Sequence, residues 1–426
     1  MFQPDVLPIK QHYSNNNDNE TVDMSSRTPL AAAIFLIAVL TTACFEADNS
    51  AQLSVSANSD GQANKVFNRI TSFPICQQLG SNCTSEGETS AEILAVSKDG
   101  NTLVYTNSPA QSLGFVDITN AEQPLGLGSL ALGGEPTSVG VKGEYALIAV
   151  NSSIDYATPS GKLVVVHIES QQQVAAFDVG GQPDSVAISP DGRFAAIAVE
   201  SERNELYCVG GQFDGESFDD ILLAEQQCEQ NGGGELGLLP QMPAGHLVIA
   251  DIAGEKPQHW QTRTVTLTGL NALYPSDPEP EYVDINSRNI AVLTLQENNH
   301  IVLVDLESGK IVNDFSAGEG RFSKTSSASN GSELALTSML REPDGASWIT
   351  DEYFATADEG DMHGGSRSFT VFNTAGDVVW SSGSELELLA EKYSYYPKSR
   401  ATEKGVEPEN VEVGVFGQQR LLFVNA

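Results

Sequence analysis

Carboxylate side chains recur at comparable places in this chain, in short turns that border apolar runs. Some stand where an apolar run begins, and others follow the end of one. The first group is Glu92, Asp184, Glu281 and Glu409, and the second is Glu200, Glu297, Asp358, Glu359 and Asp361. Carboxylate oxygens are the usual protein ligands of Ca²⁺ and Mg²⁺. If the fold gathers these turns, the sequence predicts a ligand or cation site, with Ca²⁺ as the candidate ion and Glu281, Glu409 and Asp184 as its ligands.

Gathered carboxylates also repel one another. Two of them about 4 Å apart cost roughly 4 kcal/mol at an effective dielectric constant near 20, and a divalent cation would offset that cost. The alternative is structural: the same side chains would hydrogen-bond neighbouring repeats and stiffen the turns, since such turns recur for packing reasons. His363, near Asp361, is either a further ligand or a solvated loop residue.

The turns belong to an internal repeat. A residue followed by proline opens four of its copies, at Glu135-Pro136, Gln182-Pro183, Glu279-Pro280 and Glu407-Pro408, and Ser90–Leu94 is a weaker first copy. The first two spacings, from 90 to 135 and from 135 to 182, match one four-stranded propeller blade of about 40–45 residues. The third spacing fits one blade plus an insertion. The last, from 279 to 407, fits two or three blades.

Strand and turn signals alternate within each copy. Between Glu279 and Gly309, three apolar runs, Tyr282–Ile285, Ile290–Leu295 and Ile301–Leu306, are separated by polar breaks, and Ile311–Phe315 follows. We therefore predict an all-β propeller with four-stranded blades over residues 64–426. In such a blade the turn before the first strand and the loop between the second and third lie at the same end. The carboxylates named above are then expected to ring one end of the propeller axis.

One insertion interrupts the repeat at about residues 201–244, and we expect it between the second and third strands of its blade. Its acidic run Asp214–Asp220 lacks the residue order of an EF-hand loop, so it is either a separate Ca²⁺ site or a solvated loop. Gly232–Gly237 matches GxGxxG but follows no strand, which argues against a nucleotide site. The chain contains no GxSxG and no HExxH motif, which argues against common serine hydrolases and zincins.

Several stretches together resemble the choice-of-anchor I family of exported bacterial propellers, which is related to YVTN-type and WD40-like repeats. The resemblance rests on TLQENNHIVLVD (Thr294–Asp305), TADEGD (Thr356–Asp361) and GGSRSFTVFN (Gly364–Asn373), and it runs from about Lys65 to the C-terminus. It implies an extracytoplasmic propeller of six or seven blades. The last strand pair, Asn410–Val413 and Arg420–Val424, suggests an incomplete final blade, or one that a strand near Val66 completes.

The N-terminal region carries export signals. Leu30–Leu40 is too short to span a bilayer but fits the apolar core of a signal peptide. The following Ala43-Cys44 resembles a bacterial lipoprotein signal, so residues 24–44 are expected to be the signal and Cys44 the lipidated residue. The alternative is an ordinary cleaved signal. Residues 1–23 are expected to be an upstream extension before a true start at Met24, and residues 45–63 a flexible tether.

Four further cysteines, Cys76, Cys83, Cys208 and Cys228, suggest disulfides in an exported chain. Proximity in sequence favours Cys76–Cys83 and Cys208–Cys228 among the three connectivities. We expect a lipoprotein of the outer membrane or cell surface of a Gram-negative bacterium, in contact with the membrane through its lipid anchor only.

The net charge of −35 excludes nucleic acid as a partner. We therefore expect a non-catalytic module that binds a protein, a glycan or a small molecule. The alternative is a Ca²⁺-dependent phosphoric ester hydrolase, similar to propeller phytases or alkaline phosphatases. That chemistry also needs cations to hold phosphate. The basic residues near the acidic loops are only three: Arg203, Arg367 and Lys404.

Overall fold

The computed structural model describes residues 69–79, 89–156, 158–203, 239–323, 336–360, 365–401 and 405–426. The chain divides into two units, Met1–Phe35 and Leu36–Ala426, and every described residue belongs to the second. The predicted signal, lipidation site Cys44 and tether lie outside the described residues, as do Cys83, Cys208 and Cys228. The lipid anchor and the disulfides therefore remain predictions.

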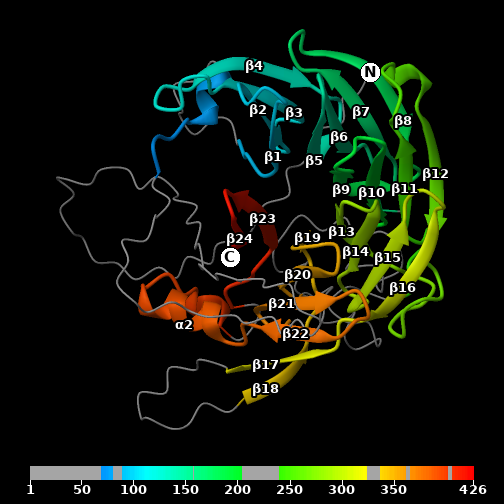
Figure 1. The fold of residues 1–426 in the computed structure, drawn as a ribbon, viewed down its shortest axis with the longest axis vertical. Coiled ribbons are helices and arrows are strands. Elements are labelled where there is room, and N and C mark those ends of the chain that lie inside the picture. The colour runs from blue at the N-terminus through cyan, green and yellow to red at the C-terminus, as the bar shows by residue number, and fades with distance from the viewer. Residues whose placement is uncertain are drawn as a thin grey trace, which may run out of the picture. The chain divides into compact units, whose positions relative to one another are not determined.

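The described residues form five four-stranded antiparallel sheets and two two-stranded ones (Figure 1). The first sheet contains β1 (Leu94–Val96), β2 (Thr102–Asn107), β3 (Ser112–Asp117) and β4 (Leu125–Ala131). The second contains β5 (Glu135–Lys142), β6 (Tyr145–Asn151), β7 (Gly161–His167) and β8 (Gln172–Asp178). The third contains β9 (Gln182–Ile188), β10 (Phe194–Glu200), β11 (His246–Asp251) and β12 (Gln261–Thr266). The fourth contains β13 (Pro280–Ile285), β14 (Ile290–Leu295), β15 (His300–Asp305) and β16 (Lys310–Ser316).

The fifth four-stranded sheet contains β19 (Ala346–Trp348), β20 (Tyr353–Asp358), β21 (Ser368–Asn373) and β22 (Val378–Ser381). Strands β23 (Asn410–Phe416) and β24 (Gln419–Asn425) form a two-stranded sheet that begins a sixth blade. Each sheet follows chain order from its first strand outward, as a propeller blade does. The predicted all-β propeller is therefore confirmed, and the strands predicted between Glu279 and Phe315 coincide with β13 to β16.

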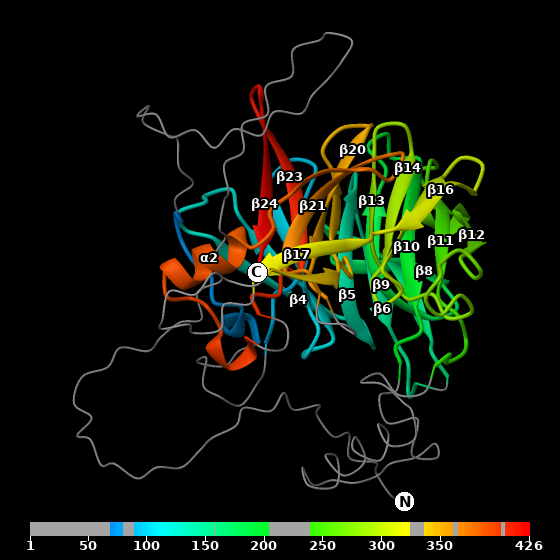
Figure 2. The ribbon, with the colours of Figure 1, turned by 90° about the horizontal axis from the view of Figure 1, so that it is seen from below.

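The innermost strands β1, β5, β9, β13, β19 and β23 lie side by side in chain order (Figures 1 and 2). Side chains on these strands accept backbone hydrogen bonds from the next blade. Ser138 Oγ accepts the Val186 N–H at 3.1 Å, and Ser185 Oγ accepts the Val283 N–H at 3.3 Å. Ser347 Oγ accepts the Val413 N–H at 3.2 Å. These bonds pair backbone groups that no sheet ladder satisfies, and they join neighbouring blades.

Apolar clusters fill the spaces between successive sheets. One cluster joins Leu247 and Ile249 of the third blade to Leu293 and Val304 of the fourth. Similar clusters lie between the first and second blades and between the fourth and fifth. Middle strands such as β6 and β10 are buried on both faces and read as continuous Ala, Val, Leu and Ile runs. This explains why the strands, rather than the site, were the plainest signal in the sequence.

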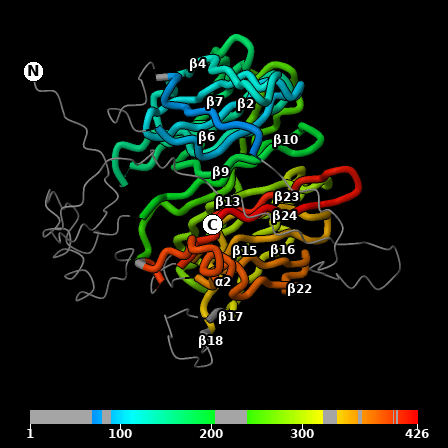
Figure 3. The backbone as a smooth tube through the Cα atoms, turned by 90° about the vertical axis from the view of Figure 1, so that its left-hand side faces the viewer, coloured from blue at the N-terminus to red at the C-terminus, as the bar shows by residue number. Residues whose placement is uncertain are grey.

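A hairpin and several helices accompany the blade strands. The hairpin β17 (Glu319–Ser323) and β18 (Leu336–Leu340) separates the fourth blade from the fifth. Helix α2 (Glu385–Lys392) precedes the sixth blade (Figure 3). Its Leu386 and Ala390 pack onto the core between the last two blades. The short helix η1 (Ile75–Leu79) contacts β4. The other short helices are η3 (Pro257–His259) and η4 (Lys398–Arg400).

The strand that we considered near Val66 falls partly outside the described residues, and its described part, Arg69–Phe73, has no regular secondary structure. The residues between β10 and β11, the second and third strands of their blade, include the range predicted as an insertion, of which residues 204–238 lie outside the described part of the chain. Among the described residues, no helix is both long and apolar enough to cross a membrane.

Candidate functional site

A local irregularity of the pairing lies near the start of three innermost strands, β5, β9 and β13. Strand β5 holds one residue more than its partner β6 between Pro136 and Ser138, so Thr137 falls in a bulge. The pairing of β9 and of β13 shifts at the same place, just after Pro183 and Pro280. Asp184 and Glu281 therefore occupy the position that Thr137 occupies in β5. A bulge turns a side chain away from the regular pleat, which lets these residues leave the sheet.

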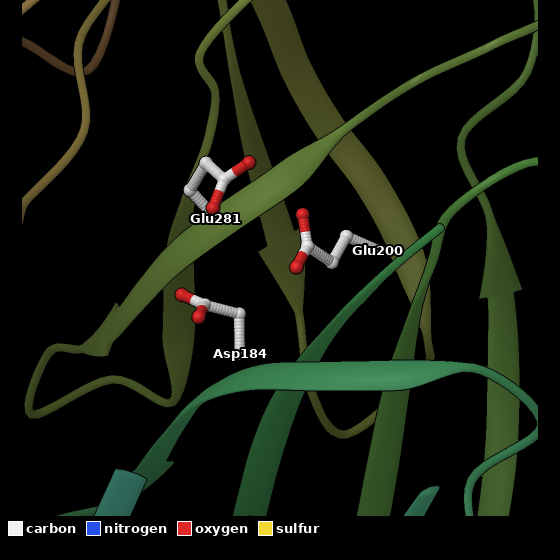
Figure 4. A group of neighbouring side chains, drawn as sticks. All are labelled: Asp184, Glu200 and Glu281. Atoms are coloured by element: carbon white, nitrogen blue, oxygen red, sulfur yellow. The ribbon is translucent and has the colours of Figure 1, made fainter. Parts of the chain in front are cut away.

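Three carboxylates meet where the third and fourth blades adjoin. Asp184 comes from β9, Glu200 ends β10, and Glu281 comes from β13 (Figure 4). One oxygen of each lies within 4.8 Å of the others, and the three half-buried side chains face one another. Two of them, Asp184 and Glu281, are among the predicted metal ligands. Glu200, the last residue of β10, completes the group. We call these three carboxylates the axial cluster.

Withdrawal from water and mutual repulsion change the acidity of this cluster. Burial, followed by the charges of Glu135 and other carboxylates, raises the pKa of Asp184 to about 7. Burial and then the charge of Asp184 raise the pKa of Glu200 well above its usual value. Burial and then the charge of Glu200 do the same to the pKa of Glu281. Each of these shifts favours the protonated form of the group, which lessens the repulsion among the three carboxyl groups.

A fourth acidic group extends the cluster toward the fifth blade. Asp344 precedes β19 in the turn Glu342-Pro343-Asp344, which is a copy of the repeated turn. Burial raises the pKa of Asp344 well above its usual value, and the charges of Glu359, Asp184, Glu409 and Glu297 add to that rise. Sequence reasoning missed Asp344, although the same pattern of proline followed by an acidic residue marks it.

The other predicted site residues are spread around this cluster. Glu92 is exposed and accepts a hydrogen bond from Ser108 Oγ at 2.7 Å, and Glu359 accepts one from Gln296 Nε2 at 2.9 Å. Glu409 is exposed and accepts a long hydrogen bond of 3.5 Å from Asn425. Glu297 adds its charge to Glu200, Glu281 and Asp344. Asp361 and His363 lie outside the described residues.

Asp358 occupies a different environment from the other predicted ligands. It is fully buried at the end of β20, and its oxygens accept hydrogen bonds from Thr356 Oγ1 at 2.7 Å and Ser368 Oγ at 2.7 Å. Thr370 Oγ1 donates a further bond at 2.5 Å, and Arg341 lies 3.8 Å away. This carboxylate is fully engaged within its own blade, so the structure does not bring it to the axial cluster.

One buried cation stands beside the cluster. The Nε atom of Arg203 lies 3.4 Å from Asp277 Oδ2 and 3.6 Å from Glu279 Oε1. Arg367, the second cation weighed for phosphate binding, is fully buried 3.4 Å from Glu387 Oε1. Lys404 lies outside the described residues. Arg203 and Arg367 therefore each form an ion pair with buried carboxylates of the protein.

This arrangement suits hard cations. Three carboxylates that each offer one or two oxygens at one point form an oxygen-only donor set, which favours Ca²⁺ or Mg²⁺ over softer metals. A bound divalent ion would favour the charged form of all three groups and remove the repulsion among them.

The chain matches the description "choice-of-anchor I domain" over residues 92–364 and again over 362–426. No curated protein matches it in sequence. Among solved structures, a periplasmic gluconolactonase of Pseudomonas aeruginosa is 14% identical with a TM-score of 0.42, covering 69% of this chain and 70% of the other. A protein of unknown function from Bacteroides caccae is 11% identical with a TM-score of 0.38, covering 71% and 84%.

Hydrazine synthase of Kuenenia stuttgartiensis is 13% identical with a TM-score of 0.33, covering 68% of this chain and 84% of the other. The family match spans nearly all of the described propeller, from the turn before β1 to the last strand. It also agrees with the stretches that carried the resemblance in sequence, and it supports an exported, surface-located binding module. The chain belongs to the choice-of-anchor I domain family.

Proposed function

We propose that this protein is a cell-envelope lipoprotein whose propeller acts as a binding module, with a divalent cation held at the axial cluster. The observation that carries the cation part is the approach of Asp184, Glu200 and Glu281 to within 4.8 Å of one another. Oxygen ligands of this kind, with several carboxylates sharing one ion, are typical of Ca²⁺ sites. The ligand of the module is a protein, a glycan or a small molecule that meets the acidic end of the axis.

Calorimetric titration of the purified, chelator-treated protein with Ca²⁺ tests the cation. We expect heat of binding and a raised melting temperature, since a ligand at about 100 times its Kd stabilises a fold by about 2.7 kcal/mol. Glu281→Gln should weaken Ca²⁺ binding at least about tenfold, because it removes one charged ligand. Glu144→Gln is the matched control, since Glu144 is exposed and lies between β5 and β6 at the far end of its blade. An absence of heat and of thermal stabilisation in millimolar Ca²⁺ would remove the cation from the proposal.

The alternative function is a Ca²⁺-dependent phosphoesterase. The acidic cluster supplies the carboxylates that would hold the metal ion. The chemistry also needs cations that bind the phosphate, and the ion pairs of Arg203 and Arg367 with protein carboxylates weigh against that role. A phosphomonoester assay with and without Ca²⁺ separates the two functions. Hydrolysis that needs Ca²⁺ and disappears in Glu281→Gln would replace the binding module with an enzyme.

A further inference from the structure

The axial cluster is assembled from two blades that its own charge pushes apart. Glu200 ends a strand of the third blade, and Glu281 lies at the start of the fourth. The strongest charged neighbours of both residues are other carboxylates, which raise their pKa values. Because like charges at this spacing repel, a contact beside the cluster must hold the end of β10 against the start of β13.

Arg203 provides such a contact. It lies three residues beyond Glu200, and its side chain is 2% exposed. Its Nη2 atom donates to the Asp277 carbonyl oxygen at 3.1 Å, and its Nε atom lies between the carboxylates of Asp277 and Glu279. The guanidinium carbon also lies over the Tyr274 ring, 5.6 Å from its centroid. Every one of these partners belongs to the segment that leads into β13.

Asp277 joins this contact to the rest of the site. It is fully buried, and its Oδ2 atom accepts the Gln241 N–H at 2.8 Å while lying 3.4 Å from Arg203. Its carbonyl oxygen accepts a bond from Asn298 Nδ2 at 3.0 Å, next to Glu297. Arg203 precedes residues 204–238 and Gln241 follows them, so both flanks of the insertion meet at Asp277.

A second bond fixes the same junction. The Ser201 N–H, one residue after Glu200, donates to Glu279 Oε2 at 3.4 Å. Glu279 lies two residues before Glu281, and its own N–H donates to Asn298 Oδ1 at 2.8 Å. Although burial alone lowers the pKa of Arg203, the surrounding carboxylates, Glu297 foremost, outweigh it and raise that pKa. The guanidinium therefore stays charged and serves as a permanent counter-ion at the blade junction.

We propose that Arg203 and Asp277 form an interblade clamp that positions Glu200 and Glu281 for cation binding and ties both flanks of residues 204–238 to the cation site. This inference rests on the proposed cation site, and it adds two residues that do not touch the ion. Residues that orient metal ligands typically change metal affinity about 10- to 100-fold when they are replaced.

Calorimetric titration with Ca²⁺ of four variants tests the clamp. Arg203→Met and Asp277→Asn should each weaken Ca²⁺ binding by about 10- to 100-fold. Arg203→Lys keeps the charge but loses the planar fork, so its affinity should lie between those of Arg203→Met and the native protein. Arg288→Met is the matched control: Arg288 is an exposed arginine that pairs with Asp351 and Glu352, across the junction of the fourth and fifth blades. It should keep native affinity.

The outcomes separate the clamp from the site itself. Native affinity in folded Arg203→Met or Asp277→Asn would overturn the clamp and leave the cation site intact. Equal weakening in Arg288→Met would also overturn it, because the effect would then reflect blade stability alone. If Arg203→Met fails to fold, Arg203→Lys and Asp277→Asn decide the question. An absence of Ca²⁺ binding by the native protein would overturn both proposals.

Discussion

At the scale of single residues, the residue after the turn proline supplies the side chain that the second, third and fourth blades place near the axis. In the second blade this residue is Thr137, whose hydroxyl donates to the Pro183 carbonyl oxygen at 2.7 Å and so stiffens the neighbouring turn. An ionised carboxylate has no proton to donate, so Asp184 and Glu281 cannot make that bond in their charged form. In the second blade a hydroxyl therefore stiffens the neighbouring turn, whereas Asp184 and Glu281 face Glu200 and each other.

The raised pKa values predict how stability depends on pH. The pKa of Asp184 is about 7 and that of Asp284 about 6, in both cases chiefly because of burial, against a usual value of 3.8. Near pH 6 the folded protein therefore binds protons that the unfolded chain does not, so in chelator the free energy of unfolding should be greater at pH 6 than at pH 8. Each group contributes at most about 1.4 kcal/mol per pH unit, less where water screens it.

Urea unfolding at the two pH values measures this difference. In Asp184→Asn one of the two groups no longer titrates, so the gain between pH 8 and pH 6 should shrink. Stability that is equal at both values, or greater at pH 8, would show that these carboxyl groups are not withdrawn from water as the structure has them.

At the scale of the elements, tight contact between the turns of the fifth and sixth blades sets the position of Asp344. The Gly345 N–H donates to the Glu409 carbonyl oxygen at 2.9 Å. A Cβ atom at Gly345 would lie 2.5 Å from Asn410 Oδ1 and 2.7 Å from the Glu409 carbonyl oxygen. A side chain at this position would therefore push the two turns apart.

Gly345→Ala should lower the free energy of unfolding by about 1–3 kcal/mol, the usual range for overpacking. Gly254→Ala is its control, since a Cβ there would meet nothing within 4 Å. Chemical denaturation of both variants makes the comparison. A Gly345→Ala protein as stable as Gly254→Ala would mean that the two turns have room to separate.

The hairpin β17–β18 and helix α2 also explain why one copy of the repeat could not be recognised from the sequence. Residues 279 to 342 and 342 to 407 span 63 and 65 positions, well beyond the usual blade length of about 40–45. The hairpin β17–β18 lengthens the first interval and helix α2 the second. The turn Glu342-Pro343-Asp344 was therefore hidden within one long interval, although its residues follow the pattern of the other turns.

The two neighbours Asp358 and Glu359 show a further limit of sequence reasoning. Both were predicted to face the axis because both follow an apolar run. Asp358 is still the last residue of β20, and the pleat turns it inward onto the hydroxyls of Thr370 and Ser368. Glu200 also ends its strand, β10, yet it lies in the axial cluster. The hydroxyls of Thr356, Ser368 and Thr370 around Asp358, and not the strand end, therefore decide its environment. Those neighbouring partners are what the sequence did not reveal.

At the scale of the whole molecule, the blades form a row in which each contacts its neighbours. Ser138 and Ser347 serve separate junctions, one between the second and third blades and one between the fifth and sixth. Replacing either serine by alanine leaves a backbone N–H without its acceptor and should cost about 1–3 kcal/mol. Because the two sites share no partner, the double variant Ser138→Ala/Ser347→Ala should lose the sum of the two costs within about 0.5 kcal/mol.

Urea unfolding of the two single variants and the double variant measures this sum. A double variant much more or much less stable than the sum predicts would mean that distant junctions are coupled through the row of blades. Such a result would contradict a description based on neighbouring contacts alone.

The bulges at the innermost strands have a consequence for engineering. At Thr137, Asp184 and Glu281 the register of the strand shifts, so these side chains depart from the alternation that packs the blade core. These three positions at the axis can therefore be substituted with less effect on the apolar strands than positions inside a strand. New chemistry can be installed there one blade at a time, with acids, hydroxyls or imidazoles, while the apolar strands that fold the protein keep their sequence.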